Sequence, residues 1–227
     1  MAVYFEPKKA FADIAARPGW IVPVILLIII GIVGTSLIGS RIGWERAMRP
    51  MLENNKRMQQ LEPAQRDAAI QQQIKFGPIF GYVAAVAYTP IKILLVAAVL
   101  LLMIKMAGAS LKYKQMFAIT AYASLPNLVA GILFIVVLFL KNPDEFNLQN
   151  PLAFNVAAFM EPPPATGRFL YSLGTSLDLF TIWIILLLAV GISAASRKVG
   201  FSKALMLVLT PWVIWVLVTS GLAGAFS

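Results

Sequence analysis

Five stretches of the chain are apolar over about 20 residues or more, and this feature limits the possible folds more than any other. A helix needs roughly 20 apolar residues to cross the ~30 Å hydrocarbon core of a bilayer. In that medium a helix satisfies its own backbone N–H and C=O groups, whereas an open strand leaves them unpaired. The runs occupy residues 20–40, 79–104, 116–140, 169–193 and 203–224. We therefore predict an all-α polytopic membrane protein, a bundle of five transmembrane helices.

The composition supports this class and argues against most enzymes. Hydrophobic residues make up 59% of the 227 residues, whereas a soluble domain is usually about 45–50% apolar. The chain has no cysteine and no histidine, which removes disulfides, thiolate nucleophiles and the commonest general base and metal ligand. Neither a GxxxxGK[ST] nor a GxGxxG loop is present to bind phosphates. We expect no enzymatic activity, no cofactor and no metal.

The net charge of +9 raises the question of a nucleic-acid partner. The basic residues lie between the apolar runs and do not cluster in one soluble region, which is typical of loops beside a lipid surface. The predicted partners are therefore membrane lipids, and other proteins or further copies of the chain, with no nucleic acid.

Two segments outside the runs have a predicted structure. Residues 1–19 contain an amphipathic stretch with Phe11, Ile14 and Ala15 on one face, which predicts a short interfacial helix on the cytoplasmic side. The membrane domain then covers residues 20–227, and its polar segment 41–78 is predicted to be an outer helical loop, with Pro63 opening a second helical piece. The first run is longer than a signal peptide and follows 19 residues, so we expect it to be retained.

The orientation is predicted from lysine and arginine in the connections. With the N-terminus inside, inner and outer segments each hold nine such residues, so the raw count decides nothing. The two short inner connections, 105–115 and 195–202, are purely basic, whereas the outer segments also hold acidic residues. We predict a multi-pass protein of the cell membrane with a cytoplasmic N-terminus and an outside C-terminus.

Two ionisable side chains lie well within the predicted spans. Lys92 is near the middle of the second span, and Asp178 is about two turns into the fourth. A charge at the bilayer centre costs about 2.5–3.5 kcal/mol on insertion scales, so such residues usually pair or line a polar cavity. The two are a candidate polar pair, coupled directly or through water. The alternatives are a structural bridge without any substrate path, and two side chains that reach separate interfacial water.

Proline recurs deep inside three of the spans, at Pro90, Pro126 and Pro211. Proline removes a helical hydrogen bond and can kink a membrane helix, and interrupted helices mark binding sites in some transporters. The polar residues beside the first two prolines are Tyr88, Tyr122 and Asn127. They are predicted kinks and polar lining, although proline is common in membrane helices in any case.

Small residues recur every four positions in the first span, at Gly31, Thr35 and Gly39. Such a stripe lets another helix approach closely. The partner helix belongs either to the same chain or to a second copy, and the sequence leaves both open.

Several passages together resemble the Yip-domain family of membrane proteins, which interact with Rab-type GTPases, and its bacterial branch in particular. They are Phe5-Glu6-Pro7 through to Pro18, the passage 117–126, the passage 172–183 with its Leu177-Asp178-Leu179-Phe180, then Gly191-Ile192 and Ser202-Lys203-Ala204. The resemblance implies five spans with a cytosolic N-terminus. Eukaryotic relatives act in vesicle traffic and bind small GTPases and one another. Their long N-terminal region and acidic-Leu-Tyr-Gly-Pro motif are absent from these 227 residues, so the resemblance does not extend to a GTPase partner.

These observations lead to one functional prediction and one alternative. The prediction is a non-enzymatic integral membrane protein of Yip-domain type that organises or recruits partners in the membrane. The alternative is a transporter or channel-like permease that uses Lys92 and Asp178. The two are distinguished by whether these side chains face a hydrated cavity.

Overall fold

The computed structural model describes residues 2–53, 56–143, 146, 148, 150–163 and 165–225, and among them all regular structure is helical. The helices in chain order are α1 (Ala2–Phe5), α2 (Pro7–Ala16), α3 (Ile21–Leu37), the π-helix η1 (Ile38–Ile42), α4 (Trp44–Glu53), α5 (Lys56–Gln59), α6 (Pro63–Met106), α7 (Tyr113–Ala123), α8 (Pro126–Leu140), the 3₁₀-helix η3 (Val156–Phe159), α9 (Arg168–Ser176), α10 (Leu179–Ala195) and α11 (Phe201–Ala225). The predicted helical membrane fold is confirmed.

Four helical stretches of the described chain are long and apolar enough to span a bilayer. They are Ile21–Ile42, Pro63–Met106, Tyr113–Leu140 and Phe201–Ala225. Each corresponds to a run in the sequence. The fifth apolar helix, Leu179–Ala195, has 17 residues and therefore a length of about 25 Å at ~1.5 Å per residue. It falls short of the ~30 Å core, and the count of five spans is not established.

The predicted fourth span, residues 169–193, is not one helix. The backbone leaves the helical region at Leu177 (φ −89°, ψ 70°) and Asp178 (φ −110°, ψ 154°), which separates α9 from α10. Asp178 sits between them as the N-cap of α10 and not two turns inside a helix. The helix is interrupted here because an aspartate side chain competes with the helix for backbone N–H groups.

Proline behaves differently from span to span. Pro78 and Pro90 remain inside the 44-residue helix α6, and Pro211 remains inside α11. Pro126 instead occupies the first turn of α8, after the short break that ends α7 at Ala123. Pro63 opens a helix as predicted, but this helix runs on through position 79 into the membrane part, so loop and second span are one element.

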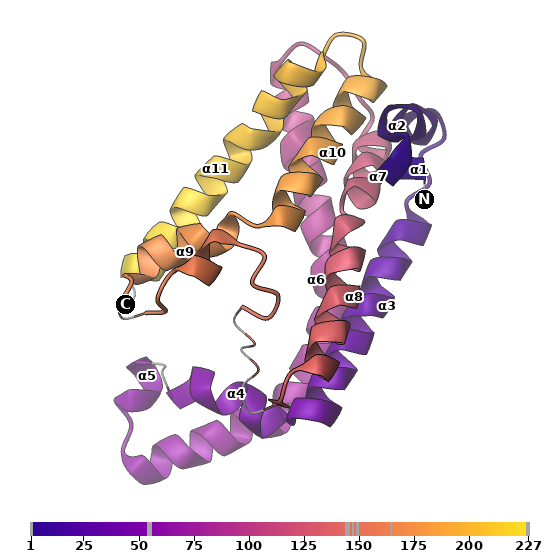
Figure 1. Cartoon of the computed structure of the whole chain (residues 1–227). Helices are drawn as coiled ribbons and strands as arrows, with labels where there is room; N and C mark the ends of the chain where they lie inside the picture. Colours follow the sequence, from indigo (N-terminus) through magenta and orange to yellow (C-terminus); the bar gives the residue numbers. More distant parts are fainter. Residues whose placement is uncertain are drawn as a thin grey trace.

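The helices form two groups that meet at one end of the molecule (Figure 1). One group contains α3 and α8, the other contains α10 and α11 with α9 beside them, and α6 lies behind and between the two. The short helices α1 and α2 and the connections α6–α7 and α10–α11 lie at the upper end in this view, whereas α4, α5 and the beginning of α6 lie at the opposite end.

The best-packed core lies near the end that contains α2. Phe11 is 0% exposed, and it packs in one cluster with Met116 and Ile119 of α7 and Ile192 of α10. The two faces of this helix differ as its sequence pattern indicates, since Ala15 is also buried and Lys8 is exposed. Its apolar face packs on α7 and α10 of the same chain.

Candidate functional site

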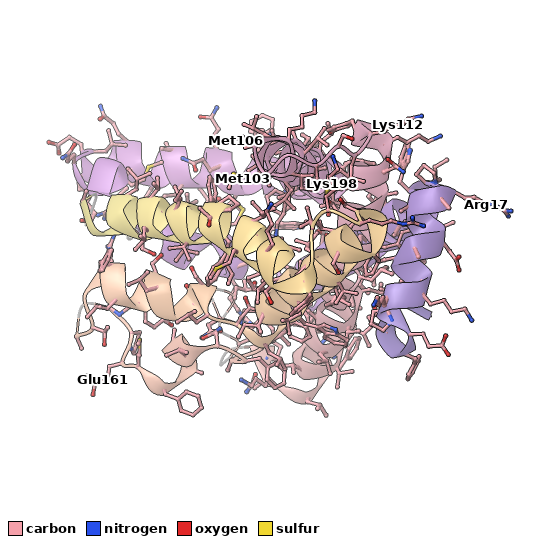
Figure 2. The ribbon with its side chains drawn as sticks, turned by 90° about the horizontal axis from the view of Figure 1, so that it is seen from above. Arg17, Met103, Met106, Lys112, Glu161 and Lys198 are labelled. Atoms are coloured by element: carbon pink, nitrogen blue, oxygen red, sulfur yellow. The ribbon has the colours of Figure 1, made fainter. Side chains whose placement is uncertain are left out.

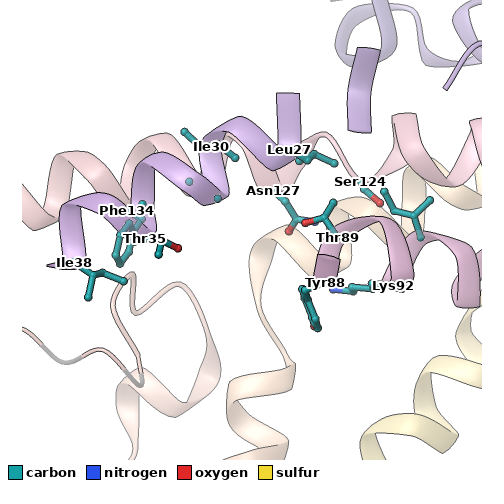
Figure 3. A pocket seen from close by; sticks show the side chains of 14 residues that line it. Leu27, Ile30, Thr35, Ile38, Tyr88, Thr89, Lys92, Ser124, Asn127 and Phe134 are labelled. Carbon is teal, nitrogen blue, oxygen red and sulfur yellow. The ribbon is translucent and has the colours of Figure 1, made fainter. Parts of the chain in front are cut away.

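A pocket of about 360 Å³ lies among α3, α6 and the α7–α8 junction, within the membrane-spanning part. One wall is a single face of α3 and the start of η1, because its contributing residues from Leu27 to Ile38 recur at helical spacing. The polar side chains that line the pocket are Thr35, Tyr88, Thr89, Lys92, Ser124 and Asn127 (Figure 3). The other lining residues are apolar side chains and glycines.

Lys92 contributes the positive charge of this pocket. Helical side chains lean toward the N-terminal end of their helix, and the Lys92 ammonium accordingly lies 5.8 Å from the centre of the Tyr88 ring, one turn earlier in α6. Both side chains are exposed. The aromatic ring offers the cation a weak electrostatic partner and leaves its N–H donors available.

Glycines allow the three walls to approach one another. A Cβ atom on Gly131 of α8 would lie 2.5 Å from Ile30 Cγ1 of α3, and one on Gly81 of α6 would lie 3.3 Å from Thr35 Cγ2 of α3. Gly31 lies against Ala85 of α6, where a Cβ atom would make an ordinary contact. On the same stripe, Gly39 faces Trp44. In the structure, Gly31 and Gly39 of the small-residue stripe lie against elements of their own chain.

The pocket brings together five of the residues singled out in the sequence: Gly31, Thr35, Tyr88, Lys92 and Asn127. The sequence analysis missed two of its polar residues, Thr89 and Ser124. Each precedes a proline of the membrane part by one or two positions. That position was an available signal, because a proline leaves backbone carbonyls of the preceding turn without a partner, and nearby polar side chains gather there.

The remaining predicted residues lie elsewhere. Tyr122 is half-buried against the main core cluster, and Pro126 is buried at the first turn of α8. Pro90 lies in α6, two positions before Lys92, and Pro211 lies inside α11. Among the described residues, neither Tyr122 nor any of these three prolines lines the pocket.

Asp178 has a local role in the structure. Its Oδ1 atom accepts hydrogen bonds from the backbone N–H groups of Phe180 at 2.9 Å and Thr181 at 3.0 Å. Its backbone pairs with Asn155 in an isolated antiparallel bridge. The carboxylate thus satisfies two N–H groups at the positive end of α10.

The structure gives Lys92 and Asp178 separate surroundings. Asp178 does not line the pocket, and among the described residues neither Lys92 nor Asp178 takes part in an ion pair. Energetic coupling between Lys92 and Asp178 stays a prediction. A double-mutant cycle of Lys92→Met and Asp178→Asn tests it, since coupled residues give a less than additive loss of stability.

A second feature is the end of the molecule formed by α1, α2 and the two short basic connections, which we call the N-terminal face. Hydrogen bonds fix these segments to one another. Gln115 Nε2 donates to the Ala15 carbonyl at 2.8 Å, and Lys203 Nζ donates to the Ala107 carbonyl at 3.0 Å. The Tyr4 ring packs on Trp183 at 5.3 Å, and burial raises the pKa of the Tyr4 hydroxyl.

Nine exposed cationic side chains surround the N-terminal face: Lys8, Lys9, Arg17, Lys105, Lys112, Lys114, Arg197, Lys198 and Lys203. Arg17, Lys112 and Lys198 are visible when the molecule is viewed from this end (Figure 2). The acidic residues of the same segments are Glu6 and Asp13. The face is therefore strongly positive.

Comparison with known families decides what kind of protein carries these features. The Yip1 domain matches residues 1–223. The chain belongs to the Yip1-domain family. This match covers both the pocket and the N-terminal face of the Yip1-domain protein, and it confirms the family resemblance seen in the sequence. No curated protein and no solved structure matches the chain. In the described part of this Yip1-domain protein, no three acidic residues are grouped so as to hold a metal ion.

Proposed function

We propose that this Yip1-domain protein is a non-enzymatic membrane protein that recruits partner proteins through its N-terminal face. The observation that carries the proposal is the set of nine exposed cations that three separate chain segments bring to one end of the molecule. A surface of this kind attracts acidic partners and speeds their association.

Two structural features of the N-terminal face support a role in binding partners, beyond its positive charge. The hydrogen bonds of Gln115 and Lys203 hold its segments together, so a partner need not order them on binding. Two large apolar side chains stand among the charges, Phe5 at 82% and Met106 at 75% exposed. Such residues are typical anchors at the centre of an interface with a polar rim. The partner we propose is an acidic protein segment with apolar residues, on the cytoplasmic side of the cell membrane.

The test is capture from native membranes. Tagged protein is crosslinked in intact membranes, purified and analysed by mass spectrometry, beside a variant carrying Lys8→Glu, Lys9→Glu and Lys198→Glu. A matched variant, Lys75→Glu, Lys141→Glu and Arg168→Glu, makes the same charge change on exposed residues away from this face. We expect specific partners that the first variant loses and the second retains. Equal recovery of every partner from both variants would contradict the proposal.

A second function is favoured by the pocket. A polar, cation-bearing pocket between a proline-containing helix and an interrupted one resembles the arrangement of transporter sites near the bilayer midplane. In this alternative the protein is a permease that uses Lys92 and Asp178. Solute uptake that requires both residues, measured in reconstituted vesicles, would favour it over recruitment.

A further inference from the structure

We propose that the pocket among α3, α6 and α8 binds an amphiphile with an anionic head group, a carboxylate or a phosphate, with Lys92 as its counter-ion. The proposal does not depend on recruitment at the N-terminal face. It names the ligand class of the pocket, and it holds whether or not the ligand is transported.

The depth of Lys92 favours a counter-ion. The residue lies about 21 Å from the Met106 end of α6 at ~1.5 Å per residue, well inside a hydrocarbon core of ~30 Å. Its ammonium extends only one helical turn back toward Tyr88. A charge at this depth is costly unless it is paired or hydrated.

The chain itself supplies no anion in the pocket. Its lining includes no aspartate and no glutamate, and no ion pair involves Lys92 among the residues that the structure describes. Asp178 lies outside the lining and binds the N–H groups of α10. The pocket therefore carries a net positive charge.

Two further hydrogen-bond donors line the same pocket as the ammonium. The Thr89 hydroxyl, one helical turn from Lys92, and the Asn127 amide of α8 point toward each other across the pocket (Figure 3). Neither side chain makes a hydrogen bond within the described parts of the chain. Ser124 differs, because its hydroxyl donates to the Thr120 carbonyl at 2.8 Å. An ammonium, a hydroxyl and an amide with free N–H and O–H groups match the oxygens of one carboxylate or phosphate.

The rest of the pocket favours an amphiphile over a free anion. The face of α3 and the start of η1, from Leu27 to Ile38, extends the pocket by about 16 Å at ~1.5 Å per residue. Ile30 and Ile38 on this wall and Phe134 of α8 opposite it are apolar. A volume of about 360 Å³ exceeds what a small inorganic anion fills. A hydrocarbon chain lying along α3 would fill the rest of the pocket volume.

Ligand-dependent thermal unfolding in a neutral detergent tests the proposal, because a ligand that binds the folded state raises its melting temperature. The probes are dodecanoate, its methyl ester and inorganic phosphate. We expect dodecanoate alone to raise the melting temperature of the wild-type protein. In Lys92→Met its apparent affinity should fall tenfold or more, whereas Lys92→Arg should retain binding. Lys75→Met, a matched loss of one exposed lysine in the same helix, should behave like the wild type.

The remaining possible results of these measurements also support or contradict the proposed anion site. If Lys92→Met does not fold, the double variant Thr89→Val with Asn127→Leu keeps the charge and should weaken dodecanoate binding several-fold. A shift by phosphate equal to that by dodecanoate would assign the site to a soluble anion and overturn the amphiphile. An equal shift by the methyl ester, or by dodecanoate in Lys92→Met, would overturn the anion site. Tighter binding in Asp178→Asn would overturn it as well, since it would show that Asp178 is the counter-ion.

Discussion

Gly191 lies where α2, α7 and α10 meet, and its missing side chain is what allows α2 to dock. A Cβ atom at this position would lie 2.6 Å from Ile119 Cγ2 and 3.0 Å from Phe11 Cδ1. Both neighbours are fully buried and belong to the main core cluster, so neither has free space to move into.

Gly191→Ala should therefore destabilise the protein by about 1–3 kcal/mol, the usual effect of an added methyl group in a full core. Alanine gains up to about 1 kcal/mol of helix propensity over glycine, so the control must share that gain. Gly221→Ala in α11 does, because nothing lies within 4 Å of its added Cβ. Thermal unfolding in detergent should give a lower melting temperature for the first variant and an unchanged or higher one for the second. Equal behaviour of the two would show that the α2 contact is loose.

The Asp178 side chain is a second single residue on which local stability depends, because it caps the start of α10 through hydrogen bonds. Asparagine also caps helix N-termini, whereas alanine leaves the two N–H groups of Phe180 and Thr181 without a partner. Asp178→Ala should lower the free energy of unfolding by about 0.5–2 kcal/mol, and Asp178→Asn should retain most of the stability. Asp67→Ala, on an exposed position inside α6, is the control and should change little. If Asp178→Ala unfolds at the same temperature as the wild type, the carboxylate does not stabilise α10.

At the scale of elements, α4 shows how the outer segment is attached to the spans. The indole of Trp44 lies over Gly39 at the end of the first span and over Gly81 of α6, and Met48 lies over Gly77. Gly43, at φ 84°, makes the turn between η1 and α4 that brings the indole there. The indole of Trp44, from the amphipathic helix α4, thus packs against glycines of two spans.

Trp44→Ala should release this attachment while leaving the spans in place. The expected result is faster backbone hydrogen exchange in α4 and in the first turns of α6, because local opening exposes their amides. Trp215→Ala is the matched control, since that indole is on α11 and is 67% exposed. Unchanged exchange of α4 in Trp44→Ala would mean that its other contacts suffice to hold it.

The elements also show what the sequence could predict. The apolar runs predicted the helices, because lipid requires about 20 apolar residues whatever the tertiary structure. Their ends were harder to predict. Pro90 stays inside α6 while Pro126 begins α8, and the difference depends on whether neighbouring groups satisfy the freed carbonyls. Similarly, Asp178 was recognised as a polar residue in an apolar run, but its capping geometry depends on a backbone break that hydropathy does not encode.

At the scale of the whole molecule, the pocket arises only from tertiary packing. Lys92, Tyr88 and Asn127 were recognised individually, because polar residues in membrane segments are unusual. Their convergence depends on the close approach of α3 to α6 and α8, which Gly81 of α6 and Gly131 of α8 permit. No local pattern relates Gly131 to Ile30 across about a hundred positions, so the sequence alone could not predict the pocket.

The arrangement of the two ends leads to a prediction about orientation. The N-terminal helices and both purely basic connections share one end, and α4, α5 and the beginning of α6 share the other. Because lysine and arginine are retained on the cytoplasmic side, we expect the N-terminal face to be cytoplasmic.

The chain contains no cysteine, so single cysteines can report on each end. Lys112→Cys should resist an impermeant thiol reagent in intact cells and react after permeabilisation, whereas Gln72→Cys in the exposed first part of α6 should react in both conditions. Both substitutions lie on exposed positions, so a difference in labelling reflects sidedness and not burial. Labelling of Lys112→Cys from outside, with Gln72→Cys protected, would reverse the orientation and place the cationic face, together with its acidic partners, on the outer side of the membrane.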